Sequence, residues 1–344
     1  MGADNGDCLL ISFMDTDTTF NILVDGGTVN TFRRPNGAPG PLRLALDNLK
    51  GDSESIDLGI LTHIDGDHIG GMKRAFETSG YLGSLTKKLW YNSSVLITER
   101  AKIPNIINNH IKLDKDNSAE TSFKQAYTLE QILMASNYWH RELILAGQIF
   151  KEGPCTFTIL SPNENDILEL AKEWPKEYIS AYTAGTQKSL TPSLPDLLAR
   201  DIFKDDEAPA NRSSIAFLLE AKNFKALLLG DAPDDIIRQS LHSMEYSDTN
   251  TLKLDFIKIS HHGSKHNTSQ DFLSMIETQA FIISTNGLGH LHPDRVTIAR
   301  ILHHHPNAKI YFNYENNIKL TFSSSEISLY GKNISTIQEL DFYP

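Results

Sequence analysis

The sequence predicts an α/β protein built as a four-layer αββα sandwich, with two mixed sheets packed face to face and helices outside. Short apolar runs of strand length recur in two halves of the chain, 8–62 and 214–312, and helical patterns follow the strands in each half. Polar residues of metal-binding type stand where several of these strands end, which is typical of α/β proteins with a site at strand ends.

The first half begins with two apolar runs around a polar turn. Residues 8–13 and 20–24 flank 15–19, and this pattern predicts a β-hairpin. The second run ends at Asp25-Gly26-Gly27, a turn signal. This half also contains two predicted helices, 42–49 and 69–78, and a predicted apolar strand, 56–62.

The middle of the chain is less regular, and regular alternation returns after it. Helical patterns dominate 94–147, whereas 163–211 is polar with several prolines, as insertions often are. We therefore predict one domain over 1–344 with helical insertions at about 94–147 and 163–211. The further predicted strands are 88–90, 156–160, 214–219, 226–229, 256–259, 280–284 and 309–312. The further predicted helices are 233–241, 269–276 and 296–302.

Composition limits the classes of function. Hydrophobic residues make up 40% of the 344 residues, enough for a packed core, which excludes a disordered chain. The net charge of −11 argues against a wide basic face for nucleic acid, although not against a small site that acts on a phosphate ester. Two cysteines form no disulfide framework, and no run of 18 apolar residues exists. We therefore expect a soluble, cytoplasmic protein without membrane contact.

The strongest local signal is the segment from His63 to His68. His63, Asp65, Asp67 and His68 lie within six residues, directly after an apolar strand. A turn at a strand end can direct several such side chains into one cavity, and imidazole with carboxylate suits zinc, manganese or iron. A polar surface loop is the alternative interpretation, which the density of the pattern disfavours.

This segment resembles the HxHxDH signature of the metallo-β-lactamase fold superfamily, with Asp65 in place of the second histidine. The same replacement occurs in the branch that resembles the C-terminal domain of ComEC-type DNA-uptake proteins. Further segments are similar to motifs of that branch, in order: 6–11 with 23–27, 211–214 with 228–231, 261–264 and 290–293. The resemblance covers 2–75 and 211–302 and is weak over 80–210.

The resemblance implies a site for one or two divalent cations, zinc or manganese, with magnesium as a further candidate. The implied ligands are His63, Asp65, Asp67, His68, Asp231 and His292. Asp25 would orient a ligand histidine, and His290 is the rival of His292. The superfamily's middle histidine has only His110 and the weak candidate His140 as counterparts, so the first site is rich in oxygen, which favours manganese or magnesium over zinc there.

The catalytic residues implied by the resemblance are Asp67, His261 and His262. Asp67 would bind metal and orient the attacking water, and one of the two histidines would donate a proton or contact the phosphate. The implied activity is that of a phosphodiesterase or nuclease, on nucleic acid or a nucleotide. Arg33, Arg34, Lys258 and Lys265 are the local cations, and no long basic track exists.

Two other functions stay open at this point. One is amide or thioester hydrolysis on the same fold. The other is a regulatory or partner-binding role in a multi-protein bacterial system such as phage defence, with protein partners bound through the helical insertions.

Overall fold

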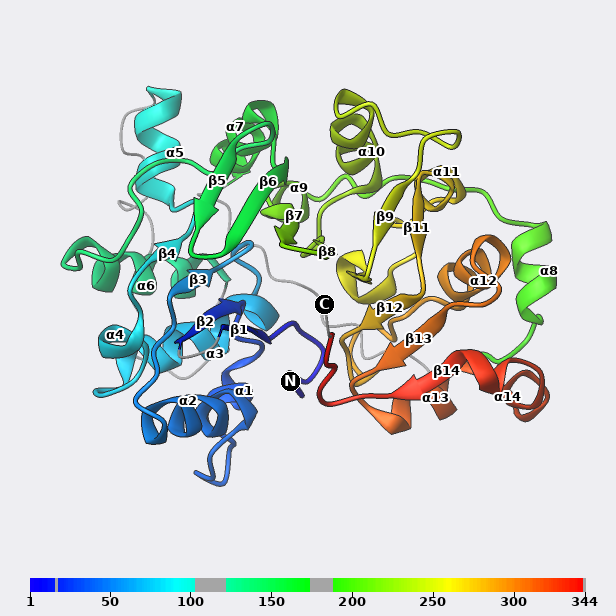
Figure 1. The fold of residues 1–344 in the computed structure, drawn as a ribbon, viewed down its shortest axis with the longest axis horizontal. Helices are drawn as coiled ribbons and strands as arrows, with labels where there is room; N and C mark the ends of the chain where they lie inside the picture. The colour runs from blue at the N-terminus through cyan, green and yellow to red at the C-terminus, as the bar shows by residue number, and fades with distance from the viewer. Residues whose placement is uncertain (16–17, 103–121, 174–187, 343–344) are drawn as a thin grey trace. The chain divides into compact units, whose positions relative to one another are not determined.

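The computed structural model describes residues 1–15, 18–102, 122–173 and 188–342 (Figure 1). The chain divides into two compact units: unit 1 is mainly 3–144 with 163–181, and unit 2 is mainly 145–162 with 182–344. Each unit contains a mixed sheet with its own helices. The predicted α/β class is therefore confirmed, whereas the face-to-face packing of the sheets and the single-domain assignment stay predictions.

Unit 1 contains a four-stranded sheet in the order β1-β2-β3-β4. Its strands are β1 (Leu9–Asp15), β2 (Thr18–Val24), β3 (Leu58–Ile60) and β4 (Leu89–Trp90). The β1–β2 pair is the predicted hairpin, and β2, β3 and β4 run parallel. Since Val24 lies opposite Ile60, the segments that follow β2 and β3 leave the sheet at the same edge.

Both helices predicted in the first half of the chain, 42–49 and 69–78, are present, with one consequential difference, whereas the short helices Val29–Phe32 and Leu82–Leu85 were not predicted. Helix α3 (Gly66–Glu77) begins three residues before the predicted start, so Asp67 and His68 lie in its first turn. The Asp65 carbonyl accepts hydrogen bonds from the His68 and Ile69 amides, at 2.8 and 2.9 Å, which starts the helix. Glycines in this stretch lower helix propensity and hid the start from sequence analysis. The others are α1 (Val29–Phe32), α2 (Pro41–Gly51), α4 (Leu82–Leu85), α5 (Ser94–Ala101), α6 (Ser122–Met134) and α7 (Glu164–Glu173).

Unit 2 contains an eight-stranded sheet in the order β14-β13-β12-β10-β8-β7-β6-β5. It is parallel from β14 to β8 and antiparallel from β8 to β5. Its strands are β5 (Ile149–Glu152), β6 (Cys155–Ser161), β7 (Ala216–Ala221), β8 (Phe224–Leu228), β10 (Phe256–Lys258), β12 (Ala280–Ile283), β13 (Lys309–Phe312) and β14 (Ile334–Thr336). A small parallel pair joins β9 (Leu252–Leu254) to β11 (Ile276–Thr278).

Several helices of unit 2 contribute residues to its hydrophobic core. Leu241 of α10 (Asp234–Ser243), Phe272 of α11 (Gln270–Ser274) and Ile298 of α12 (Arg295–His304) join buried strand residues in one cluster. The others are α8 (Leu194–Ala199), α9 (Pro209–Arg212), α13 (Glu315–Thr321), α14 (Ser324–Tyr330) and the short 3₁₀ turns η2 (Ser260–Gly263) and η3 (Gly331–Asn333). None of the helices in the described part of the chain has the length and apolarity that a membrane crossing requires.

A buried arginine joins three segments of unit 2. The Arg300 side chain on α12 is 1% exposed, and its guanidinium donates to both carboxylate oxygens of Asp201 at 2.6 and 2.7 Å. It also donates to the carbonyls of Lys265 and Thr268, at 2.7 Å each. Removing one partner of a buried pair leaves an uncompensated charge in a low dielectric, which costs more than the pair contributes.

We expect Asp201→Ala to lower the free energy of unfolding by about 3–5 kcal/mol, because Arg300 would stay buried without its carboxylate. Urea unfolding measures the loss. The control is Glu277→Ala, which removes an exposed pair with Lys253 at 3.8 Å and should change stability by about 0.5 kcal/mol or less. Equal losses in the two variants would contradict the assignment.

Candidate metal centre

Asp25 organises the polar edge of the sheet in unit 1. It follows β2, is fully buried, and has a φ of +57°, a conformation that aspartate tolerates better than most residues. Its carboxylate accepts hydrogen bonds from the Thr62 amide and hydroxyl, each at 2.8 Å, and from Nδ1 of His68 at 2.8 Å. With Nδ1 donating to Asp25, Nε2 of a neutral His68 carries the lone pair and is suited to bind a cation.

Three of the four motif side chains converge in unit 1. The rings of His63 and His68 are 4.2 Å apart, and Nε2 of His63 lies 3.7 Å from Oδ2 of Asp65. Both imidazoles are buried, whereas the Asp65 side chain is 37% exposed. The fourth side chain, Asp67, accepts a hydrogen bond from Nδ2 of Asn5 at 2.8 Å. Two imidazoles and a carboxylate at this spacing form a donor set that can hold a divalent cation.

Asp7 is a candidate ligand that sequence analysis missed. Its side chain is buried, and a carboxylate oxygen lies within 4.8 Å of a ring nitrogen of His68. Gly6 permits the approach, because a Cβ there would stand 1.7 Å from the Asp67 carbonyl oxygen, which accepts from the Asp7 amide. Residues 6–11 are one of the segments that carry the resemblance, but nothing in the sequence indicates that Asp7 returns to α3.

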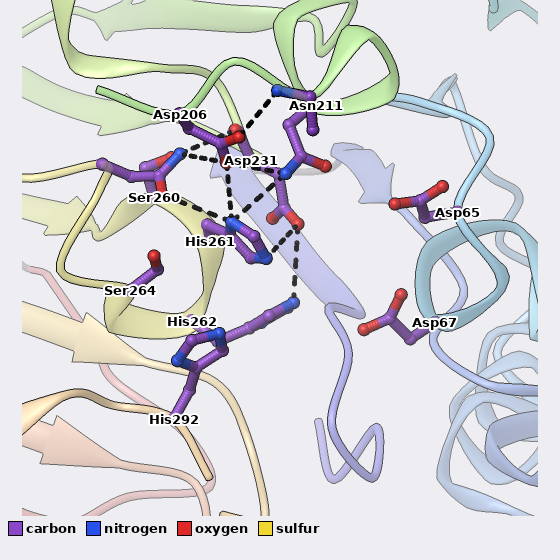
Figure 2. A network of polar contacts seen from close by, with 12 residues as sticks. Asp65, Asp67, Asp206, Asn211, Asp231, Ser260, His261, His262, Ser264 and His292 are labelled. Atoms are coloured by element: carbon purple, nitrogen blue, oxygen red, sulfur yellow. Dashed lines mark hydrogen bonds and ion pairs between the residues drawn. The ribbon is translucent and has the colours of Figure 1, made fainter. Parts of the chain in front are cut away.

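The polar site of unit 2 is built on a strained turn after β10. His261 and His262 have φ values of +45° and +53°, and two successive non-glycine residues in this region store strain. The turn is held because the His261 amide donates to the Gly230 carbonyl at 3.0 Å. Figure 2 shows both imidazoles directed at Asp231, which follows the neighbouring strand β8. Strain of this kind is typical of functional sites.

His262 is oriented as a metal ligand. The Ser284 carbonyl can only accept a hydrogen bond, so Nδ1 of His262 is the donor in their 2.8 Å contact. Nε2 then faces Oδ2 of Asp231, 3.8 Å away, and both groups are buried. In the neutral form of the ring, Nε2 carries the lone pair that a metal ion binds. Two ligand atoms on one zinc-type ion would be about 3.4 Å apart. The pair therefore fits a cation with a small adjustment.

His261 is held from behind by a carboxylate. Its Nδ1 donates to Oδ2 of Asp206 at 3.1 Å, and Oδ1 of Asn267 lies 3.2 Å away, while Nε2 lies 3.7 Å from Asp231. Burial lowers the pKa of His261, but the charges of Asp231 and Asp206 outweigh it and raise the pKa above its usual value. Asp206 stands 55 residues before His261, in a segment that the sequence marks only as a polar insertion.

The remaining candidate histidines differ in their distance from these two groups of residues. The His292 ring lies 5.2 Å from that of His261, and burial lowers its pKa to about 4, so it is neutral at pH 7. His290 is exposed and its ring lies 6.0 Å from that of His292. In unit 1, the amide of His140 donates to the Leu89 carbonyl beside β4. His110 lies outside the described residues.

Comparison with known proteins gives a limited set of similarities. No protein-family model matches the chain. ComE operon protein 3 of Bacillus subtilis (strain 168) is 25% identical over 126 residues, which are 34% of this chain and 16% of that protein. The chain therefore matches about one sixth of that relative's length.

Among solved structures, zinc-bound PqqB from Methylobacterium extorquens has a TM-score of 0.41 at 10% identity, covering 98% of this chain and 88% of PqqB. The metallo-β-lactamase fold protein YhfI from Bacillus subtilis has a TM-score of 0.37 at 13% identity, covering 98% and 94%. Metallo-β-lactamases such as SMB-1 also match, with a TM-score of 0.32 over 77% of this chain.

We expect Asp25→Asn to weaken metal binding more than it weakens the fold. The amide oxygen can still accept from Thr62, but the amide nitrogen would donate to Nδ1 of His68 and place the ring proton on Nε2. Loss of such an orienting carboxylate typically costs about 10- to 100-fold in metal affinity. Competition against a chelating dye measures affinity, and thermal unfolding of the metal-free protein measures stability. An affinity equal to that of the wild type would contradict the orienting role.

The Asp206 carboxylate should make the metal-free protein sensitive to acid. Burial alone would raise the pKa of Asp206, but the His261 interaction and the Ala208 and Asn211 donors lower it to about 2. An unfolded aspartate has a pKa of about 3.9. The stabilisation, about 2 kcal/mol, is therefore present above pH 4 and lost as the pH falls toward 2.

Unfolding of the chelator-treated protein at pH 6, 5, 4 and 3 tests this dependence. The Asp206→Asn variant should lose less stability over this range than the wild type. The matched control is Asp248→Asn at an exposed position, which should follow the wild-type curve. A parallel curve for Asp206→Asn would show that this carboxylate is not stabilised in the folded state.

Proposed function

We propose that this protein is a metal-dependent hydrolase of phosphodiester bonds. The observation that carries the metal dependence is the buried His262–Asp231 pair: Nδ1–H of His262 is held by the Ser284 carbonyl, so Nε2 faces Oδ2 of Asp231 at 3.8 Å. A buried carboxylate needs a compensating positive charge, and a cation bound by Nε2 and Oδ2 would supply it. Two contacts in unit 1 support the same proposal. His63 lies beside Asp65, and His68 is oriented by the contact of its Nδ1 with Asp25.

We assign the ligand role of unit 2 to Asp231 and His262 and that of unit 1 to His63, Asp65, Asp67 and His68, with Asp7 added. Each set by itself offers imidazole and carboxylate donors for a divalent ion. The set is rich in carboxylates, which suits manganese as well as zinc. When bound, such ions lower the pKa of a coordinated water and neutralise charge on the phosphate oxygens. The proposal moves the ligand role from His292 to His262, because Nε2 of His262 faces Asp231.

His261 is the proposed general acid. Asp206 accepts its Nδ1–H and fixes the ring, so Nε2 carries the transferable proton on the side of Asp231. The proton would pass from Nε2 to the leaving oxygen as the phosphorus–oxygen bond breaks and the attacking water's oxygen bonds to phosphorus. Asp67 is the proposed acceptor of the proton that this water loses. Asp231 and Asp206 raise the pKa of His261, the direction that a general acid requires.

Alanine variants of the three histidines should separate these roles. His262→Ala should lose bound metal and activity together, because a ligand is removed. His261→Ala should keep its metal and lose about 100- to 10,000-fold in kcat on bis-p-nitrophenyl phosphate. His292→Ala is the matched comparison and should retain the metal. Mass spectrometry of bound metal beside the rate of each variant provides the measurement.

Specific outcomes would overturn this assignment. Full metal content in His262→Ala with loss of metal in His292→Ala would return the ligand role to His292. A wild-type protein that binds manganese or zinc but hydrolyses a thioester or an amide in preference to the phosphodiester would assign another reaction class. No hydrolysis of any of these substrates by the metal-loaded protein would favour the regulatory role.

A further inference from the structure

Unit 1 contains a basic cavity that the proposed catalytic residues do not use. Its volume is about 300 Å³, and it lies between α1, the segment that follows α1, and α3. The charged side chains that line it are Arg33, Arg34, Lys73, Arg74 and Glu77. Four cations and one carboxylate give the cavity a charge of +3, on a chain whose net charge is −11. This concentration of cations points to an anionic ligand.

The backbone presents these cations in a fixed arrangement. Gly70 lets α3 approach the start of α1, because a Cβ there would stand 2.8 Å from the Val29 nitrogen. The segment from Arg33 to Pro39 forms a turn. The Arg34 amide donates to the Ala38 carbonyl at 3.0 Å, and Arg33 and Pro39 form an isolated antiparallel β-bridge. Both guanidiniums therefore start from an ordered turn at the edge of the cavity.

Glu77 does not balance the arginines of this turn. Its carboxylate lies 3.1 Å from the Lys73 ammonium and 3.5 Å from the Arg74 guanidinium. Among the described residues, no carboxylate lies within 4.0 Å of the guanidinium of Arg33 or Arg34. Arginine presents a planar fork of donors that matches the oxygens of a phosphate in two parallel hydrogen bonds. Two such forks in one concave site therefore suit an oxyanion such as a phosphate better than a lone halide ion.

The cavity shares a helix face with a residue of the metal motif. Asp67, Gly70 and Arg74 stand at i, i+3 and i+7 along α3, which places them on one side of the helix. Seven residues span about 10.5 Å along a helix axis, and stacked nucleotides of one strand are about 3.4 Å apart. A strand whose phosphate occupies the cavity would therefore reach the Asp67 end of α3 about three nucleotides away.

We propose that this cavity binds a backbone phosphate of a single-stranded oligonucleotide, about three nucleotides from the phosphate that is cleaved. This inference rests on the proposed function and names its substrate class: a strand of several nucleotides instead of a mononucleotide or cyclic nucleotide. The cavity would supply a few local contacts to the backbone, which suits a chain whose net charge of −11 argues against a wide basic face.

Fluorescence anisotropy with a labelled oligothymidylate of eight nucleotides, in EDTA, tests the proposal without hydrolysis. The double variant Arg33→Gln, Arg34→Gln should bind at least about 10-fold more weakly than the wild type. The slope of log affinity against log salt should also fall by about 0.7 for each phosphate that the variant no longer neutralises. The matched control is Lys50→Gln, an exposed cation of unit 1 that lies over the Tyr81 ring and does not line the cavity. Its affinity should equal that of the wild type.

The outcomes separate this inference from the proposed function. Wild-type protein that hydrolyses bis-p-nitrophenyl phosphate but does not bind the octamer would overturn the inference alone. Equal affinities for the double variant and for Lys50→Gln would overturn it too, and so would thymidine 5′-monophosphate or inorganic phosphate that competes as strongly as the octamer. Octamer binding that depends on the two arginines, in a protein that hydrolyses no phosphodiester, would support the cavity and overturn the proposed activity. Unchanged thermal unfolding of the double variant would exclude a folding defect.

Discussion

The polar site of unit 2 depends on the burial of the Arg300 guanidinium. A charge that is taken out of water must be paired, and Arg300 is paired with Asp201 and with two carbonyls of the segment that follows His262. These hydrogen bonds fix the segment after α8 beside the segment after η2. The Asp206 amide then donates to the His266 carbonyl at 3.1 Å, and the Asp206 carboxylate accepts from His261. The orientation of His261 is thus a consequence of pairing one buried cation several residues away.

Unit 1 contains a buried carboxylate whose burial is compensated by hydrogen bonds. Asp25 lies in the interior after β2, and its carboxylate accepts from three donors of Thr62 and His68. Because β2 and β3 are parallel neighbours, these donors lie at the same sheet edge without any long connection. In both units a carboxylate accepts the Nδ1–H of an imidazole. Asp25 does so for His68, and Asp206 does so for His261. This is the arrangement by which proteins orient histidine ligands.

Three residues of the candidate sites adopt backbone conformations that non-glycine residues rarely adopt. Asp25, His261 and His262 all have positive φ values, and each is held by hydrogen bonds to a neighbouring strand or to the segment that follows it. Such conformations persist only where the surrounding structure fixes them, and they are expected where a side chain must be directed at a reacting group. The packed sheet offsets the strain, because its hydrogen bonds hold both ends of the turn.

The sequence by itself determined the α/β class, most strands and helices, and the metal-binding character of the segment from His63 to His68. These properties follow from local periodicity and from residue type, which act over a few neighbouring positions. It did not determine the start of α3 at Gly66, because glycines mask helix propensity, nor the different orientations of His261 and His262. Only the tertiary structure brought Asp7 to His68 and Asp206 to His261, because these pairs are 61 and 55 residues apart and are joined through packing that no local pattern records.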